Sequence, residues 1–311
     1  MIHGAILIAL AALLWATTSI VAKFLFNGTE LQAITLGFLR LVVALPLFYA
    51  LMRREQRELA GTTSAISLRN LTMKALIPLA ALGLFQAFYQ GSYLLAVDLT
   101  GAGIATLIAL CLPPVLVAIM AAPLLGERPG LVTVLALIAA IMGTGMLVIS
   151  DMDTTGQLRL AGILMALLAA VVYTGFTLTS RYNSAGTPVF TTAFICFLTA
   201  ALILLPVVAL TGGFTGLATL EPRHWLMVAY IGVVPTCIGY VCFFSGMKTT
   251  PATLSSIIVT LEPLFVALLA WLILGEVLGV IGIAGALILT TAVIVASRSN
   301  AGKAPGTANA D

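Results

Sequence analysis

Two charged residues, Arg40 and Glu262, stand inside long apolar runs of the sequence. A charge in the middle of a membrane helix is costly and usually faces the interior of a helix bundle. Counted along helices at about 1.5 Å per residue, both lie about 12 Å from the same face of a hydrocarbon core about 30 Å thick. They could therefore form an intramembrane charge pair. Such a pair could lock two helices together, contact a bound molecule, or carry a proton on Glu262.

A polar and aromatic face follows within the apolar run 74–97. Gln86, Tyr89, Gln90 and Tyr93 are spaced i, i+3, i+4 and i+7, which places them on one face of a helix. Two amides and two phenols do not suit lipid, so this face requires either a neighbouring helix or a water-filled cavity. We expect a cavity, because four polar groups exceed what one helix contact usually needs.

Three other apolar runs carry aromatic and hydroxyl residues that could line the same cavity. They are Trp15 and Thr18, Tyr173 and Thr177, and Tyr240 and Phe244. The alternative is that these side chains only pack in the core. Trp15 lies too deep in its run to belong to the aromatic belt at a membrane surface.

Prolines interrupt two of the apolar runs at corresponding points. Pro113 and Pro114 lie in the run 100–122, and Pro263 lies in the run 250–273. A proline removes one backbone hydrogen bond and kinks a helix. These positions could act as hinges, or they could be static kinks.

The elements that must position these residues are membrane helices. The chain is 61% hydrophobic and only 8% charged, which is too little charge to cover a soluble protein of 311 residues. We therefore predict an all-α integral membrane protein with ten transmembrane helices. Their expected ranges are 4–22, 32–51, 74–97, 100–122, 130–150, 161–180, 189–210, 223–246, 250–273 and 277–297.

The chain contains an internal repeat. Residues 112–130 and 261–279 align without a gap and share a proline, Pro114 and Pro263, followed by a Gly-Glu pair, Gly126-Glu127 and Gly275-Glu276. The expected repeats span 4–150 and 161–297, with a disordered cytoplasmic tail over 298–311. Since each repeat holds five helices, the second enters the membrane from the opposite side, as in alternating-access transporters, and the two surround a central cavity.

The distribution of Lys and Arg predicts the orientation, because cytoplasmic loops retain positive charge. One side of the predicted bundle collects most of the positive residues, including those of loop 52–74, Arg181 and Lys248. The other side collects Lys23, Arg159 and Arg223. Both termini are therefore expected in the cytoplasm.

The proline-bearing run that ends in Leu124-Leu125-Gly126-Glu127-Arg128 is similar to the EamA domain, and so is Leu261-Glu262-Pro263 leading to Leu274-Gly275-Glu276. EamA domains occur in tandem in the drug/metabolite transporter superfamily. The nearest likeness is to bacterial amino acid exporters, including those for aromatic amino acids. The resemblance implies a carrier in the bacterial inner membrane that exports amino acids or similar small metabolites. One departure is that Cys196 stands in the second repeat where the first has Arg40.

Other functions remain as alternatives. The same superfamily exports cationic drugs and other metabolites. A channel would require a selectivity filter, and none is recognisable. A membrane-embedded enzyme would require a nucleophile with its base, a metal-binding cluster or paired carboxylates, and the sequence shows none of these motifs. The expected partners are a small-molecule substrate, the lipid bilayer and, for a coupled carrier, protons. We expect a monomer with no metal, cofactor or nucleic acid.

Overall fold

The computed structural model describes residues 2–59, 73–100, 102–127, 129–150, 160–184, 187–274 and 279–301, and all regular structure in these ranges is helical. The first half contains α1 (Ile2–Gly28), α2 (Ala33–Leu59), α3 (Met73–Thr100), α4 (Ala102–Leu125) and α5 (Leu131–Ser150). The second half contains α6 (Leu160–Asn183), α7 (Val189–Leu210), η2 (Thr215–Thr219), α8 (Pro222–Ile231), η3 (Gly232–Ile238), α9 (Gly239–Met247), α10 (Ala252–Val259), α11 (Leu261–Leu274) and α12 (Val280–Ala301).

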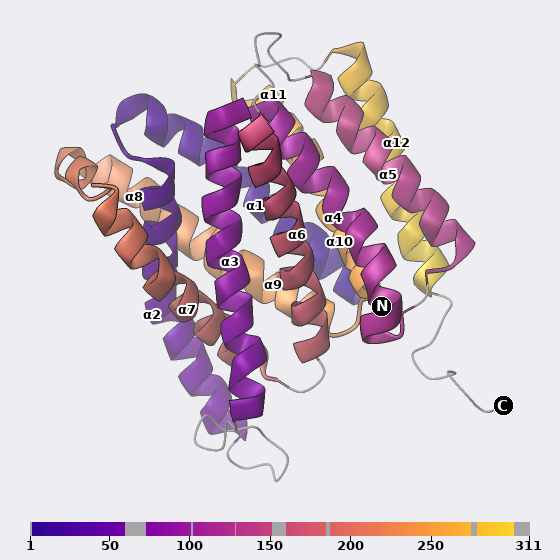
Figure 1. Cartoon of the computed structure of the whole chain (residues 1–311), viewed down its shortest axis with the longest axis horizontal. Coiled ribbons are helices and arrows are strands. Elements are labelled where there is room, and N and C mark those ends of the chain that lie inside the picture. The colour runs from indigo at the N-terminus through magenta and orange to yellow at the C-terminus, as the bar shows by residue number, and fades with distance from the viewer. Residues whose placement is uncertain are drawn as a thin grey trace.

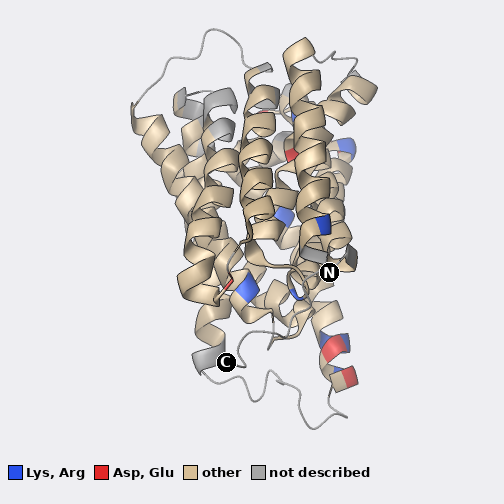
Figure 2. Ribbon diagram, turned by 90° about the vertical axis from the view of Figure 1, so that its right-hand side faces the viewer, with Lys and Arg blue, Asp and Glu red and all other residues tan. Residues whose placement is uncertain are grey.

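The protein is a multi-pass membrane protein by the length and composition of its helices. Within the described ranges, eight helical runs are long and apolar enough to cross a bilayer, and α5 adds a shorter apolar helix over Leu131–Met146. Segments α8, η3 and α9 together form one of the eight runs, Pro222–Met247, and α10 continues into α11 to form another. Charged residues are few in Figure 2, and most of the ribbon is tan.

Helices from the two halves of the chain pack against each other. Four of the largest helix contacts join α5 to α12, α3 to α6, α2 to α7, and α1 to α9. In Figure 1, α5 lies beside α12 at one edge of the bundle, and α3 lies beside α6. Neither half is therefore a separate body, and any space at the centre of the bundle is enclosed by helices of both.

Two glycines of the bundle make corresponding contacts. Gly83 on α3 lies so close to α7 that an added Cβ would collide with the carbonyl oxygen of Cys196. Gly232 at the start of η3 lies equally close to α2, where an added Cβ would meet Val43 and the carbonyl oxygen of Arg40. Only glycine permits these approaches, since any side chain would force the helices apart.

The helix α2 is longer than expected. The sequence analysis ended it at residue 51 and placed 52–73 in a loop, but α2 continues to Leu59. The extension is rich in Arg, Glu and Gln, which favour helices, and an ion pair of 2.9 Å joins Arg54 to Glu58 four residues later. At the other end of the chain, α12 reaches Ala301, so residues 298–301 are helical rather than part of a tail, and 302–311 lie outside the described residues.

The prolines act differently in the two halves. α4 runs unbroken through Pro113 and Pro114. In the second half, the helix is interrupted at Thr260 between α10 and α11. The reason is that Pro263 has no N–H to donate to the carbonyl of Val259 four residues earlier. The expected interruption at Pro263 is thus present, whereas the prolines of α4 lie inside one continuous helix.

A π-helical segment, η3, was not expected from the sequence. It contains Pro235, which cannot donate to the carbonyl of Ile231. The hydroxyl of Thr236 donates to that carbonyl instead, at 2.7 Å. Segments of this kind are frequent at functional sites, and this one leads directly into α9.

Candidate functional site

Aromatic side chains from α1, α6, α7 and α9 meet near the centre of the bundle around Tyr240. Its ring lies 4.8 Å from the ring of Trp15 and 4.7 Å from that of Phe197. Phe176 and Phe244 lie at 6.2 and 6.1 Å. These five residues and Phe243, which contacts Trp15, Phe176 and Phe244, are here called the aromatic cluster. It brings together Trp15, Tyr240 and Phe244, which the sequence analysis had placed in one cavity.

The polar face of α3 reaches the same place. Gln86 is only 2% exposed, and its Nε2 donates a hydrogen bond of 3.0 Å to the Tyr240 hydroxyl. Gln90 packs against α2, where its amide nitrogen would lie 3.0 Å from a Cβ on Gly37. The first amide therefore orients an aromatic residue of the cluster, and the second fills a contact between two helices.

Three tyrosines extend the aromatic cluster toward α3. The rings of Tyr89 and Tyr93 stack at 5.7 Å with an angle of 12° between their planes. Tyr89 also lies 5.2 Å from Tyr173, which in turn lies 6.2 Å from Phe176. A continuous aromatic surface thus runs from α3 through α6 to α9. Of the predicted hydroxyl residues, Thr177 donates to the Tyr173 carbonyl at 3.0 Å, so its hydroxyl is satisfied within its own helix.

Arg40 and Glu262 lie near this aromatic surface without forming a direct ion pair. Among the described residues, no ion pair or hydrogen bond involves either side chain. Glu262 nevertheless interacts electrostatically with Arg40, and both interact with Tyr240. Glu262 also reaches Tyr89 and Tyr173. The direct pair predicted from equal depth is therefore absent from the described residues, because depth along a helix does not determine the rotation that a direct contact needs.

Three polar donors near the cluster have no hydrogen-bond partner in the part of the chain that the structure describes. The Trp15 indole nitrogen, the Thr18 hydroxyl and the Arg40 Nε are buried, and none has a hydrogen-bond partner among the described residues. Buried donors are usually satisfied because an unmade hydrogen bond costs about 1–3 kcal/mol. Unpaired donors beside a tyrosine-lined surface are what a site for a polar ligand requires.

The sequence analysis missed Phe176, Phe197 and Phe243. All three are at most 1% exposed and were taken for ordinary apolar residues. A signal existed, because Phe176 and Phe243 each follow a predicted cavity tyrosine, Tyr173 and Tyr240, by three residues and so share its helix face. Phe197 could not be found this way, because no predicted site residue lies on α7.

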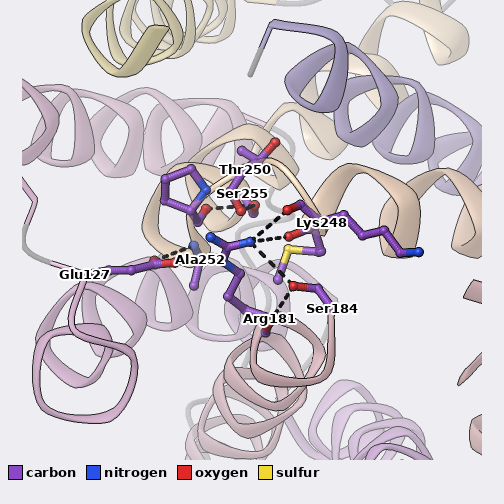
Figure 3. A network of polar contacts seen from close by, with 9 residues as sticks. Glu127, Arg181, Ser184, Lys248, Thr250, Ala252 and Ser255 are labelled. Carbon is purple, nitrogen blue, oxygen red and sulfur yellow. Dashed lines mark hydrogen bonds and ion pairs between the residues drawn. The ribbon is translucent and has the colours of Figure 1, made fainter. Parts of the chain in front are cut away.

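A second polar network lies at the end of the bundle that carries Arg181 and Lys248, here called the Arg181 end (Figure 3). The Arg181 Nε donates to Glu127 Oε1 at 2.7 Å. Its Nη1 donates to the carbonyls of Met247 and Lys248 at 2.8 and 3.2 Å. The other Glu127 oxygen accepts the backbone N–H of Ala252 at 2.7 Å. We call these five residues the Arg181 clasp.

The turn that presents Glu127 explains why the repeated motif is Gly-Glu. Gly126 has a φ of 68°, a left-handed conformation that glycine adopts without strain. The N–H groups of Gly126 and Glu127 return to the carbonyls of Ala122 and Ala121 at 3.1 and 3.2 Å, which closes α4. The matching residues of the second copy, Gly275 and Glu276, lie outside the described residues.

A family model matches nearly the whole chain, and the similar proteins are named as transporters. The EamA-like transporter family matches residues 2–149 and 160–298. The uncharacterized transporter YwfM of Bacillus subtilis (strain 168) is 31% identical over 192 residues, which are 62% of this chain and 63% of that protein, less than two thirds of its length. An uncharacterized transporter of Clostridium kluyveri is 27% identical over 306 residues, 96% of this chain and 94% of that protein.

A solved structure shows the same fold. A protein crystal structure with 21% sequence identity superposes with a TM-score of 0.73 and covers 95% of this chain and 97% of that one. At this identity the likeness concerns the fold alone.

Proposed function

The chain belongs to the EamA-like transporter family, and from this premise we propose that it is an alternating-access carrier that exports amino acids, aromatic ones among them, from the cytoplasm. The observation that carries the proposal is an aromatic surface beside two opposite charges, Arg40 and Glu262, neither of which forms an ion pair or hydrogen bond with the described residues. The family consists of transporters rather than enzymes, so the membrane-embedded enzyme is set aside.

The substrate class follows from the chemistry of the site. A zwitterionic amino acid carries one carboxylate and one ammonium group. Arg40 offers a fork of donors that suits a carboxylate, and Glu262 offers an acceptor that suits an ammonium group. Tyr89, Tyr173 and Tyr240 are close enough to Glu262 to interact with it electrostatically. An aromatic surface of this kind favours an apolar or aromatic side chain over a sugar.

The proposed architecture is two inverted five-helix repeats, each with one EamA domain, around a central cavity. The helix packing supports it. A two-fold axis would exchange predicted helices one to five with helices six to ten. The contact of α3 with α6 would then be equivalent to the contact of α8–α9 with α1, and the contact of α4 with α6 would be equivalent to that of α10–α11 with α1. All four contacts are present. The glycine contacts fit the same two-fold relation. Gly83 lies against Cys196, and Gly232 lies against Arg40. In the repeat alignment Gly232 corresponds to Gly83 and Arg40 corresponds to Cys196, so the two contacts are equivalent.

We further propose that the Arg181 end faces the cytoplasm of a bacterial cell and that the chain spans the inner membrane with both termini inside. Reporter fusions at residue 60 should then signal from the cytoplasm, and fusions within 212–222 from the periplasm. A periplasmic signal from residue 60 would reverse the direction of transport that we assign.

The proposed function is tested in proteoliposomes with the purified protein. We expect radiolabelled phenylalanine or tyrosine to show saturable counterflow, and a neutral sugar of similar size to show none. Counterflow also separates a carrier from a channel, because a channel does not exchange one labelled molecule for another. Absence of counterflow with every amino acid tested would refute the assignment.

A second candidate, an exporter of cationic drugs, is favoured by the electrostatic interaction of Glu262 with three tyrosines, Tyr89, Tyr173 and Tyr240. Aromatic rings and a carboxylate together bind an organic cation without any need for Arg40. Arg40→Leu therefore separates the candidates: it should abolish amino acid exchange but spare or enhance the export of an organic cation.

A further inference from the structure

The Arg181 clasp joins the two matched regions of the chain. Glu127 belongs to the first region, whereas Arg181, Met247, Lys248 and Ala252 belong to the second. The side chains of Arg181 and Glu127 are only 25% and 18% exposed. A partly buried ion pair with further backbone partners is held more firmly than a pair in open solvent. The clasp is therefore a specific connection between the halves at one end of the bundle.

One part held by the clasp is a short half-helix. α10 begins after Pro251, whose side chain makes no capping hydrogen bond, and Glu127 accepts the N–H of Ala252 in its place. A carboxylate at a helix N-terminus is stabilising because it also meets the positive end of the helix dipole. Since the helix is interrupted at Thr260, α10 can move without carrying all of α11 with it.

The space below the clasp is closed by apolar side chains. Val117 and Ala121 on α4 pack with Leu178 on α6 and Ala252 on α10, in a small cluster separate from the main core. Three of these four residues are 0% exposed, and Leu178 is 5% exposed. These four residues, here called the plug, close the α4–α6–α10 contact, and one of them, Ala252, donates its N–H to the Glu127 carboxylate.

A small pocket of about 10 Å³ lies between the clasp region and one residue of the aromatic cluster. Ser184 and Lys248, which contact Arg181, line this pocket together with Asn183 and Thr187. Phe244 of the aromatic cluster also lines it. Residues that contact the clasp and a residue of the proposed binding site therefore border the same small space.

We propose that the Arg181 clasp is the gate at this end of the carrier: Glu127 must release Arg181 and the N-terminus of α10 before the plug opens and substrate reaches the aromatic cluster. The proposal rests on the transport function proposed above. In this view the structure shows the carrier closed at the Arg181 end.

Cysteine accessibility tests the gate without knowledge of the substrate. In a variant with the four native cysteines replaced, Ala121→Cys places a thiol in the plug, and Leu178→Cys gives a second probe from the facing helix. Reaction with a small water-soluble methanethiosulfonate is measured in the Glu127→Gln and Arg181→Gln backgrounds. The matched control is Glu58→Gln, which removes the exposed pair Arg54–Glu58 at the same end, with side chains 79% and 65% exposed.

We expect the labelling rate to rise about fivefold in both clasp variants and not in the control, since loss of an ion pair worth about 1 kcal/mol shifts a closed–open equilibrium by that factor. Glu127→Gln retains an oxygen for the Ala252 N–H, so the fold should persist. Unchanged labelling at both probes, or an equal rise in the control, would overturn the gate. A rise without counterflow of any amino acid would support the gate and refute the substrate instead.

Discussion

Two Arg–Glu combinations take one residue from each half of the described chain, and they differ because one is a direct ion pair and the other is not. In the clasp, Arg181 meets Glu127 at 2.7 Å and the remaining groups bind backbone. In the bundle centre, Arg40 and Glu262 interact across a distance without any ion pair among the described residues. Arginine and glutamate thus form a direct ion pair in the clasp, whereas in the bundle centre they remain available to bind another molecule.

The difference teaches where to look for a ligand. Taking a charge out of water costs several kcal/mol unless a partner compensates. The clasp supplies that compensation from within the protein, so its charges hold the structure together. Arg40 and Glu262 form no such contact with the described residues, and charges inside membrane helices are for this reason candidates for a functional role. The ligand site is therefore inferred from unsatisfied charge rather than from the number of polar residues.

The sharpest way to break this comparison is to remove the central charges. We expect Arg40→Leu to reduce amino acid counterflow about 10- to 150-fold, which corresponds to the loss of a charge-assisted interaction worth about 1.5–3 kcal/mol. Thermal stability in detergent should change little, because no ion pair is broken.

The structural alternative predicts the reverse. If Arg40 and Glu262 lock α2 to α11 through an ion pair, each single Leu substitution should cost about 3–5 kcal/mol of stability. The double variant should then recover much of that loss and still transport. Recovery of this kind would show that the central charges resemble the clasp after all.

Glu262→Gln sharpens the comparison by separating substrate binding from proton coupling. If Glu262 holds the ammonium group, the neutral amide should lower counterflow about tenfold, because a charge-assisted hydrogen bond becomes a neutral one. If Glu262 instead carries a proton, uptake driven by a pH gradient should vanish while counterflow stays intact. We expect the first outcome, measured in proteoliposomes with and without a pH gradient.

A smaller loss of stability is expected from breaking the hydrogen bond between Gln86 and Tyr240, because both groups belong to the protein. Gln86→Leu removes the donor to the Tyr240 hydroxyl, and Tyr240→Phe removes its acceptor. Each single change should cost about 1–3 kcal/mol, mainly because it strands a buried partner, and the double change should cost less than the sum. Unfolding in detergent measures the coupling. A coupling energy of zero would mean that this hydrogen bond does not orient the ring.

The sequence predicted the apolar helices and the two EamA domains, because both depend on local composition and motifs. Helix periodicity grouped Gln86, Tyr89 and Tyr93 on one face, and the structure brings Trp15 and Tyr240 into contact, as does Gln86 with Tyr240. It failed where long-range packing decides. The partner of Glu127, the π-helical segment before Tyr240 and the contact of Phe197 with Tyr240 all join residues far apart in sequence or depend on a local proline. The extension of α2 was missed because charged residues were read as a loop, although they also favour helices in water.

That extension gives the smallest and cleanest test. Glu55 stands on the extended part of α2 and caps α7: its Oε2 accepts the Thr191 N–H at 3.0 Å, and its Oε1 accepts the Phe190 N–H at 3.3 Å. α7 needs this cap because its own N-cap residue is Pro188, which makes no side-chain hydrogen bond. Like Glu127, Glu55 joins the two halves through a helix N-terminus, but it does so without an arginine.

Glu55→Gln keeps one acceptor oxygen and loses the charge, so we expect a destabilisation of about 1 kcal/mol. The control Glu58→Gln, one turn further along α2 and 65% exposed, should change stability by less than about 0.5 kcal/mol. Because the contact lacks an ion pair and the plug lies on other helices, Glu55→Gln should leave the labelling of Ala121→Cys unchanged. If it raised that labelling as much as Glu127→Gln does, gating would belong to every carboxylate cap at this end rather than to the Arg181 clasp.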